Sequence, residues 1–290
     1  MNMPTMESVS RFKAAMDSDR GALGPFMICT DPAMVEAAGR AGYDFVLLDM
    51  EHGTTTFQTL PNLIRAANVT GVCPVVRVPR GSDIWIDQAL DVGAGAVMIP
   101  QIDTAEQARA AVSAAKFSPV GTRGTCRFVR SAGFGDVPGS EYFSKAQDTV
   151  VILQAEGKKA IENLDEILDV PGIDVVFVGP YDLSSSLGHV GEIDHPEVVA
   201  ANSGLGDVPS AMMTTSHGTS NSDPSFSTGL RRPLSSGSPS VISTHRSPRT
   251  QPCSSPSTST GLASIRKTIP SSLAWCTSSA RAGSSASERR

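Results

Sequence analysis

The sequence predicts an α/β fold built around a parallel β-sheet, and three observations lead to that expectation. Six short and almost continuously apolar runs lie between residues 24 and 182. Segments with the apolar spacing of amphipathic helices separate these runs. Ionisable side chains gather at or just beyond the C-terminal ends of the runs. Strands that are apolar on both faces need helices on both sides of their sheet, so either a doubly wound sheet or a (β/α)8 barrel is expected.

The first half of this region contains three strand–helix units. The expected strands cover residues 24–30, 43–50 and 73–79, and the helices that follow them cover residues 33–42, 55–71 and 82–93. Asp31 and Pro32 supply the N-cap and the first-turn proline that favour a helix start. The first helix is therefore expected to begin directly after Asp31.

The second half continues the alternation around a long loop. Strands are expected at residues 96–102, 149–156 and 174–182, with helices at residues 103–117 and 158–172. Thr104 and Gln107 have the spacing of a capping box at the start of the first of these helices. The glycine-rich loop at residues 118–136 carries Arg123, Arg127 and Arg130. A lid over a substrate and a solvated basic loop are both consistent with this composition.

Composition narrows the classes of function. The 290 residues are 40% hydrophobic and 5% aromatic, which is typical of an α/β protein with an aliphatic core. A formal net charge of −5 gives no reason to expect nucleic acid or an anionic membrane as a partner. No apolar run approaches the roughly 18–20 residues of a transmembrane helix, and the N-terminus lacks the apolar core of a signal peptide. We therefore expect a cytoplasmic protein whose five cysteines are reduced.

The character of the chain changes near residue 201. Of the 89 residues from 202 to 290, 35 are serine or threonine, and proline recurs throughout. Nine Lys/Arg and three Asp/Glu give this segment a charge of 9 − 3 = +6, which leaves −5 − 6 = −11 for residues 1–201. The segment has neither helical nor strand periodicity, so we expect a disordered or out-of-frame tail at 202–290. Residues 1–201 are then an incomplete (β/α) barrel, without candidates for strands seven and eight.

The polar residues at the strand ends favour the barrel over the doubly wound sheet. In a barrel, the C-terminal ends of all strands meet at one mouth, and active sites lie there. In addition, no glycine-rich phosphate turn follows the first strand. The side chains expected at this mouth are those of Asp49, Glu51, His52, Arg77, Glu156 and Asp182.

Glu156 and Asp182 end two neighbouring strands and form a candidate metal site. Two carboxylates at one barrel mouth repel each other unless a cation lies between them. Ligation by oxygen alone suits Mg²⁺ or Mn²⁺. The alternative is that both residues cap helices or pair with lysines such as Lys158.

Arg77, His52 and Asp49 are the other candidates for catalysis. A guanidinium inside a strand pattern needs an anion, which is either a substrate oxygen or a structural carboxylate. His52 is a candidate general base if Asp49 fixes its tautomer, and otherwise a polar surface residue.

These stretches resemble the HpcH/HpaI family of metal-dependent (class II) pyruvate aldolases. The matching segments are AGYDFVLLDMEH, PVVRVP, DVGAGAVMIPQ, SPVGTRG, VILQAE, ILDVPGIDVVFVGPYDLSSSLG and HPEV, in this order across roughly residues 10–201. The resemblance implies a (β/α)8 TIM barrel of the phosphoenolpyruvate/pyruvate type that lacks its last two βα units. It also implies a homo-oligomer, which is commonly a hexamer in the family.

The resemblance also implies roles for individual residues. Glu156 and Asp182 are the expected ligands of Mg²⁺, Mn²⁺ or Co²⁺. Arg77 is expected to contact the keto oxygen of pyruvate, and His52 with Asp49 to be the acid/base pair. The remaining expected substrate-binding residues are Gln154, Gly179, Pro180, Tyr181 and Asp91, the last of them reaching into a neighbouring subunit.

The implied reaction is the retro-aldol cleavage of a 4-hydroxy-2-oxo acid to pyruvate and an aldehyde, through a pyruvate enolate held at the metal. Two alternatives remain open. One is a lyase for CoA thioesters of the citrate lyase or malyl-CoA lyase type. The other is an inactive, truncated aldolase chain that acts at most as an interaction partner, because the tail departs from the family's pattern.

Overall fold

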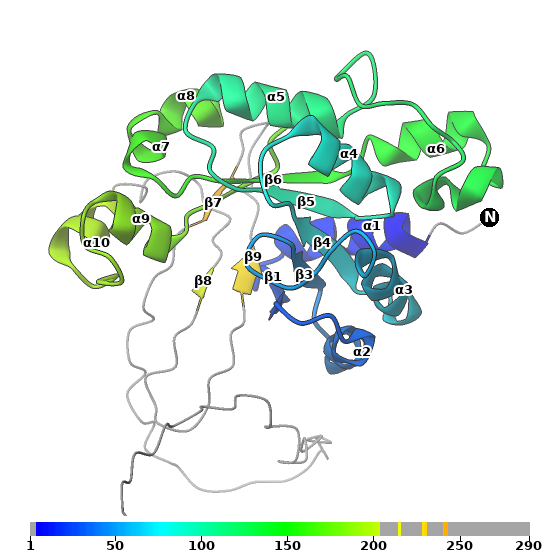
Figure 1. Ribbon diagram of the computed structural model, residues 1–290, viewed down its shortest axis with the longest axis horizontal. Coiled ribbons are helices and arrows are strands. Elements are labelled where there is room, and N and C mark those ends of the chain that lie inside the picture. Colours follow the sequence, from blue (N-terminus) through cyan, green and yellow to red (C-terminus); the bar gives the residue numbers. More distant parts are fainter. Residues whose placement is uncertain (1–3, 204–213, 216–227, 231–239, 243–290) are drawn as a thin grey trace, which may run out of the picture. The chain divides into compact units, whose positions relative to one another are not determined.

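The computed structural model describes residues 4–203, 214–215, 228–230 and 240–242 (Figure 1). All of these residues belong to one compact unit of the chain, Met1–Ser247. In the part of the chain that the structure describes, no helix is long and apolar enough to cross a membrane. The expected character of residues 202–290 falls mostly outside the described residues, and the division of the chain at residue 201 stays a prediction.

The core of the fold is a seven-stranded sheet in the order β10-β7-β6-β5-β4-β3-β2. Every neighbouring pair in it is parallel. Six of its strands lie where the sequence predicts them, which confirms the α/β class and the parallel sheet. They are β2 (Phe26–Met27), β3 (Phe45–Asp49), β4 (Cys73–Arg77), β5 (Ala96–Ile99), β6 (Val150–Gln154) and β7 (Val175–Phe177).

Helices connect consecutive strands of this sheet, as parallel pairing requires. The expected ones are α2 (Pro32–Ala41), α3 (Leu60–Thr70), α4 (Asp83–Asp91) and α5 (Ala105–Ala115). Asp31 caps α2 by accepting a hydrogen bond from the Ala33 N–H, and Thr104 with Gln107 forms the predicted capping box of α5. The segment at 158–172 divides at Asn163 into α7 (Lys158–Glu162) and α8 (Leu164–Leu168).

Several elements were not predicted. The N-terminal helix α1 (Pro4–Met16) precedes the short strand β1 (Ala22–Gly24), and the 3₁₀ helix η1 (Arg130–Gly135) and α6 (Gly139–Ala146) lie in the long loop before β6. After β7 come α9 (Pro180–Ser186) and α10 (Pro196–Ser203).

Three short strands lie beyond residue 201, where the sequence offered no strand candidates. β10 (Ser240–Ile242) pairs in parallel with β7 and so extends the sheet beyond its sixth predicted strand. β8 (Thr214–Thr215) and β9 (Thr228–Leu230) form an antiparallel sheet with β1. Periodicity could not indicate these strands, because each is only two or three residues long.

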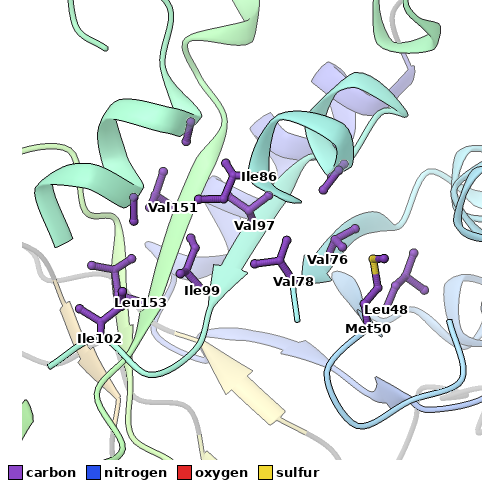
Figure 2. Packing of buried hydrophobic residues seen from close by; sticks show 14 of the residues in the cluster. Leu48, Met50, Val76, Val78, Ile86, Val97, Ile99, Ile102, Val151 and Leu153 are labelled. Atoms are coloured by element: carbon purple, nitrogen blue, oxygen red, sulfur yellow. The ribbon is translucent and has the colours of Figure 1, made fainter. Parts of the chain in front are cut away.

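Alternate residues of the strands face two different cores. Val46 and Leu48 of β3 belong to the larger cluster, in which helices α2 to α5 cover the sheet. Figure 2 shows this layer, with Ile86 of α4 close to Val97 of β5. Phe45 and Leu47 belong to the second cluster, which includes residues of α1. Because both faces of the strands are buried, their positions are fixed, and so are the residues at their ends.

Candidate active site

The site lies at the C-terminal ends of the strands, where the sequence places it. Asp49 is the last residue of β3, and Arg77 is the last residue of β4. The parallel register sets these two residues directly beside each other. Gln154 ends β6, Glu156 follows two residues later, and Asp182 lies in the first turn of α9, after β7.

Asp49 and Arg77 form a buried, two-pronged ion pair. Arg77 Nε donates to Asp49 Oδ1 at 2.9 Å, and Arg77 Nη2 donates to Asp49 Oδ2 at 2.6 Å. Burial alone would raise the pKa of the Asp49 carboxyl, but the hydrogen bonds and charge of Arg77 hold it below its ordinary value. Burial would likewise lower the pKa of Arg77, and Asp49 outweighs that effect and raises it. Both groups therefore stay ionised, and the guanidinium has a fixed orientation.

Glu51 and Phe26 hold the guanidinium from other sides. Arg77 Nη1 lies 3.1 Å from Glu51 Oε2, and the guanidinium carbon lies 5.2 Å from the centre of the Phe26 ring. Burial raises the pKa of Glu51, while Arg77 opposes that rise. Glu51 was predicted to lie at the barrel mouth, without a role. Its position two residues after Asp49 was the only signal available.

His52 is placed differently from the expected pair with Asp49. Its backbone N–H, rather than its imidazole, donates to Asp49 Oδ1 at 3.3 Å, and the backbone N–H of Glu51 donates to the same oxygen at 3.0 Å. No hydrogen bond to the His52 imidazole is found within residues 4–203, where its side chain is exposed. Asp49 therefore orders the backbone turn that carries His52, and it orients Arg77.

Glu156 is buried and held by two donors. Its Oε1 accepts from the Gln101 N–H at 2.9 Å, and its Oε2 accepts from Gln154 Nε2 at 2.8 Å. Gln101 has a φ of 58°, a left-handed conformation that is uncommon outside glycine. This turn after β5 directs the Gln101 N–H at the carboxylate.

The Glu156 and Asp182 carboxylates converge at Gly179. A Cβ atom added to Gly179 would lie 3.2 Å from Glu156 Oε2 and 3.3 Å from Asp182 Oδ2. Gly179 is also the N-cap residue of α9, whose first turn contains Asp182. The absence of a side chain at Gly179 thus leaves a space between two carboxylate oxygens.

The electrostatics of this space call for a cation. Burial, and then the charges of Asp182 and Glu51, raise the pKa of Glu156 to about 8. Four carboxylates and one guanidinium interact here, so the site carries 1 − 4 = −3 when all of them are ionised. Gln154 Oε1 is buried and has no hydrogen-bond partner within the described residues. Carboxylate oxygens around a space with an unpaired amide oxygen nearby fit a hard divalent ion and its water ligands.

The remaining predicted residues are more dispersed. Pro180 is the first residue of α9, and Tyr181 follows it with 49% of its surface exposed. Asp91 ends α4, just before the chain enters β5 from its N-terminal end, and so lies away from the strand ends that carry Asp49 and Arg77. Its carboxylate accepts from Arg123 Nη2 at 3.0 Å. The role predicted for Asp91 in a neighbouring subunit's site stays a prediction.

Two of the three arginines of the long loop bind neighbouring elements, and Arg127 binds within the loop. Arg123 is buried and also donates to the Tyr142 hydroxyl. Arg127 bonds to the Gly135 carbonyl, and Arg130 donates to the Val92 carbonyl at 2.9 Å. These contacts order the loop, and they fit neither a freely solvated basic loop nor a set of arginines aimed at the metal space.

Comparison with known proteins gives a consistent result. The family model of HpcH/HpaI aldolase/citrate lyase matches residues 23–211. The chain is 44% identical over 179 residues to 2-dehydro-3,6-dideoxy-6-sulfogluconate aldolase of Pseudomonas putida, a match that covers 61% of this chain and 69% of that protein. It is 43% identical over 189 residues to 2-keto-3-deoxy-L-rhamnonate aldolase of Escherichia coli K12, covering 64% and 70%. A family protein from Burkholderia cenocepacia superposes with a TM-score of 0.62 at 35% identity, covering 67% of this chain and 76% of that structure.

Proposed function

Because this chain belongs to the HpcH/HpaI aldolase/citrate lyase family, we propose that it is a metal-dependent aldolase. The reaction is the cleavage of a 4-hydroxy-2-oxo acid to pyruvate and an aldehyde. Both similar aldolases are named for 2-oxo acids that lack a hydroxyl at carbon 3. Cleavage of such an acid between carbons 3 and 4 leaves its first three carbons as pyruvate, which supports this substrate class.

The observation that carries the proposal is the convergence of Glu156 and Asp182 on Gly179. These two carboxylates are the residues that would hold the ion, and their all-oxygen donor set suits Mg²⁺ or Mn²⁺. When bound, the ion supplies Lewis acidity toward the oxygens of a 2-oxo acid. Gln154, with its buried and unpaired Oε1, is a polar contact for the same substrate or for a water beside it.

Arg77 stabilises the negative charge that develops on the keto oxygen as carbons 3 and 4 separate. Asp49 and Glu51 hold the guanidinium in place before the substrate arrives, so little reorganisation is needed during the reaction. Loss of such a preorganised donor typically costs about a hundredfold or more in kcat. The two carboxylates are positioning residues, because they act through Arg77.

His52 takes the proton from the hydroxyl at carbon 4, directly or through a water molecule. Because Asp49 binds the backbone N–H of His52 and not its ring, this role is supported by the position of His52 three residues after the end of β3 and by the family resemblance. The turn fixed by Asp49 places the backbone of His52 close to the strand end that carries Asp49. Histidine is the side chain that most often serves as a general base.

The assembly and the metal belong to the same proposal. We expect Mg²⁺ or Mn²⁺ as the resident ion, small 2-oxo acids and aldehydes as the reacting partners, and a homo-oligomer as the working form. The relatives support the substrate class, whereas the ion and the subunit number need direct measurement by metal analysis and by light scattering.

The test is a pyruvate-release assay on the full chain. With a 4-hydroxy-2-oxo acid and Mg²⁺ or Mn²⁺, pyruvate should appear at a rate that depends on the ion. Release of acetyl-CoA or another CoA thioester from citryl-CoA or malyl-CoA, without activity on the oxo acid, would support the alternative CoA-thioester lyase. Turnover of neither substrate by a folded chain would support the inactive form.

A further inference from the structure

A second group of possible metal ligands lies outside the active site, in the turn between α9 and α10. The segment HVGEIDH, residues 189–195, repeats a ligating side chain every third residue, at His189, Glu192 and His195. The Glu192 N–H donates to the His189 carbonyl at 2.9 Å, and the His195 N–H donates to the Glu192 carbonyl at 3.0 Å. Bonds between residues three apart bring the side chains at these positions to one face of the turn.

The turn is anchored to α9 by Ser184. The His189 N–H donates to the Ser184 carbonyl at 2.8 Å, and the Gly191 N–H donates to the Ser184 hydroxyl at 3.0 Å. Ser184 is fully buried. Gly188 and Gly191 have φ values of 85° and 82°, a left-handed conformation that glycine adopts without strain. The backbone that presents the three side chains is therefore ordered before any ligand arrives.

The three side chains lie close enough to share one ion. One ligand atom each of His189, Glu192 and His195 lies within 4.8 Å of the other two. The two imidazole rings stack with their centres 3.5 Å apart and their planes inclined by 20°. Ligand atoms around a tetrahedral ion with bonds of about 2.0–2.1 Å are about 3.3 Å apart. The ligand atoms must therefore close in by up to about 1.5 Å, and the rings must turn out of their stack, because an imidazole binds an ion in its own ring plane.

The hydrogen bonds of the two rings leave suitable lone pairs. His189 Nε2 lies 2.9 Å from Glu197 Oε2, so in the neutral ring the proton is on Nε2 and the lone pair is on Nδ1. In metal sites, the second ring nitrogen of a ligating histidine usually donates a hydrogen bond to a carboxylate or a carbonyl. His195 Nδ1 accepts a bond of 3.3 Å from the Glu197 N–H, so this long bond must break when Nδ1 binds an ion.

We propose that His189, Glu192 and His195 bind a divalent ion of the Zn²⁺ class, with Glu197 as the carboxylate behind His189. Two imidazole nitrogens and one carboxylate oxygen form a donor set that zinc and the neighbouring late transition metals prefer. The active-site carboxylates offer oxygen alone and suit harder ions. All three ligands lie in the turn between α9 and α10, so a bound ion stabilises the conformation of this turn.

Zinc titration of the full chain tests this proposal. The substitution Asp182→Asn is introduced first, so that zinc bound at the active site does not add to the measured stoichiometry. After chelation and dialysis, zinc is titrated in excess Mg²⁺ against a chromophoric competitor. The expected result is one tightly bound zinc ion. The additional exchange His195→Asn should weaken zinc binding at least about tenfold, while asparagine still serves as an N-cap for α10.

Asp194→Asn is the matched control, because it removes an exposed acidic group from the same turn without touching the three ligands. Its zinc affinity should equal that of the parent. Equal zinc binding in the His195→Asn and Asp194→Asn chains, or no zinc bound by the parent, would overturn the proposal. If His195→Asn changes the circular dichroism, Glu192→Gln provides the same comparison with a nearly isosteric exchange.

Discussion

At the scale of single residues, Arg77 is the most tightly constrained group of the site. Three of its nitrogens are held by two carboxylates, and the Phe26 ring lies against the guanidinium. An arginine that served only as a structural ion pair would need one carboxylate. The two carboxylates fix the orientation of the guanidinium, which the proposed contact with substrate requires.

Arg77→Ala should reduce kcat about a hundredfold or more, because one preorganised donor for the developing negative charge is lost. Metal binding should persist, since Glu156 and Asp182 remain. Steady-state pyruvate release and Mn²⁺ titration give the two readings. Arg109→Ala, at an exposed ion pair on α5, is the control. Near-normal turnover of the Arg77→Ala chain would remove Arg77 from the mechanism.

Glu156 should make the stability of the metal-free protein depend on pH. Its pKa is raised to about 8 in the folded chain from an ordinary value of 4.5. Between these values the folded chain keeps a proton that the unfolded chain has lost. The free energy of unfolding therefore contains a contribution that is complete below about pH 4.5 and is lost as pH rises through about 8.

Thermal unfolding in the presence of a chelator measures this contribution. The Tm should fall between pH 6 and pH 9, by about 2–4 °C for each kcal/mol lost in a chain of this size. Glu156→Gln carries no titrating group and should show a smaller fall, whereas Glu166→Gln, at an exposed position on α8, should behave like the parent. Parallel pH profiles for all three chains would contradict the buried, protonated state of Glu156.

The sequence indicated most of the site residues but not their contacts. Asp49, Arg77, Glu156 and Asp182 were predictable, because polar residues that end apolar strands meet at one edge of a parallel sheet. The hydrogen-bond partner of Asp49 could not be predicted, because it depends on strand register. The register places the Asp49 carboxylate against Arg77 and not against the His52 ring. Gln101 was also missed, since its contribution is a backbone N–H, which any residue supplies.

At the scale of elements, the turn from β7 into α9 builds the metal space. Strand β7 ends at Phe177, Gly179 is the N-cap residue of α9, and Asp182 lies in the first turn of that helix. A side chain at residue 179 would crowd the oxygens of Glu156 and Asp182 at 3.2 and 3.3 Å.

Gly179→Ala should weaken Mn²⁺ binding and turnover with little effect on the fold. Its methyl group would lie 3.2–3.3 Å from the two carboxylate oxygens, in the space that the ion needs. Gly139→Ala is the matched control, because its Cβ meets Phe143 atoms only at ordinary distances of 3.5 and 3.8 Å. Titration calorimetry with Mn²⁺ compares the two chains, and equal affinities would place the ion elsewhere.

Elements with strong periodicity were predicted, and those that depend on tertiary contacts were missed. The capping box and the alanine-rich face of α5 specify that helix locally. By contrast, α6 begins with glycine and serine, and its buried Tyr142 packs against Phe117 and Phe143. Local propensity in α6 is weak, and packing decides its conformation.

At the scale of the whole molecule, β10 changes how the sheet ends. Parallel pairing with Ser240–Ile242 covers the edge of β7 that would otherwise present unpaired backbone groups. The family barrel has eight strands, and the described residues supply seven in a single sheet. The segment after residue 201 therefore contributes to the sheet despite its serine-rich composition.

Truncation shows whether β10 protects this edge. A chain ending at residue 203 should aggregate faster than a chain ending at residue 247, because only the longer chain pairs β7 on both sides. Light scattering at equal concentration and temperature gives the comparison. Equal or slower aggregation of the shorter chain would show that β10 does not cover the sheet edge.

In the proposed mechanism, Glu156 and Asp182 together hold the divalent ion on which cleavage depends. The direct measurement is pyruvate release by the full chain during Mn²⁺ titration after complete chelation, with circular dichroism recorded at each step. Turnover should be absent without the ion, should rise with its occupancy, and should stay absent in Glu156→Gln and Asp182→Asn. A compact, metal-free chain that cleaves a 4-hydroxy-2-oxo acid at the full rate would contradict the claim.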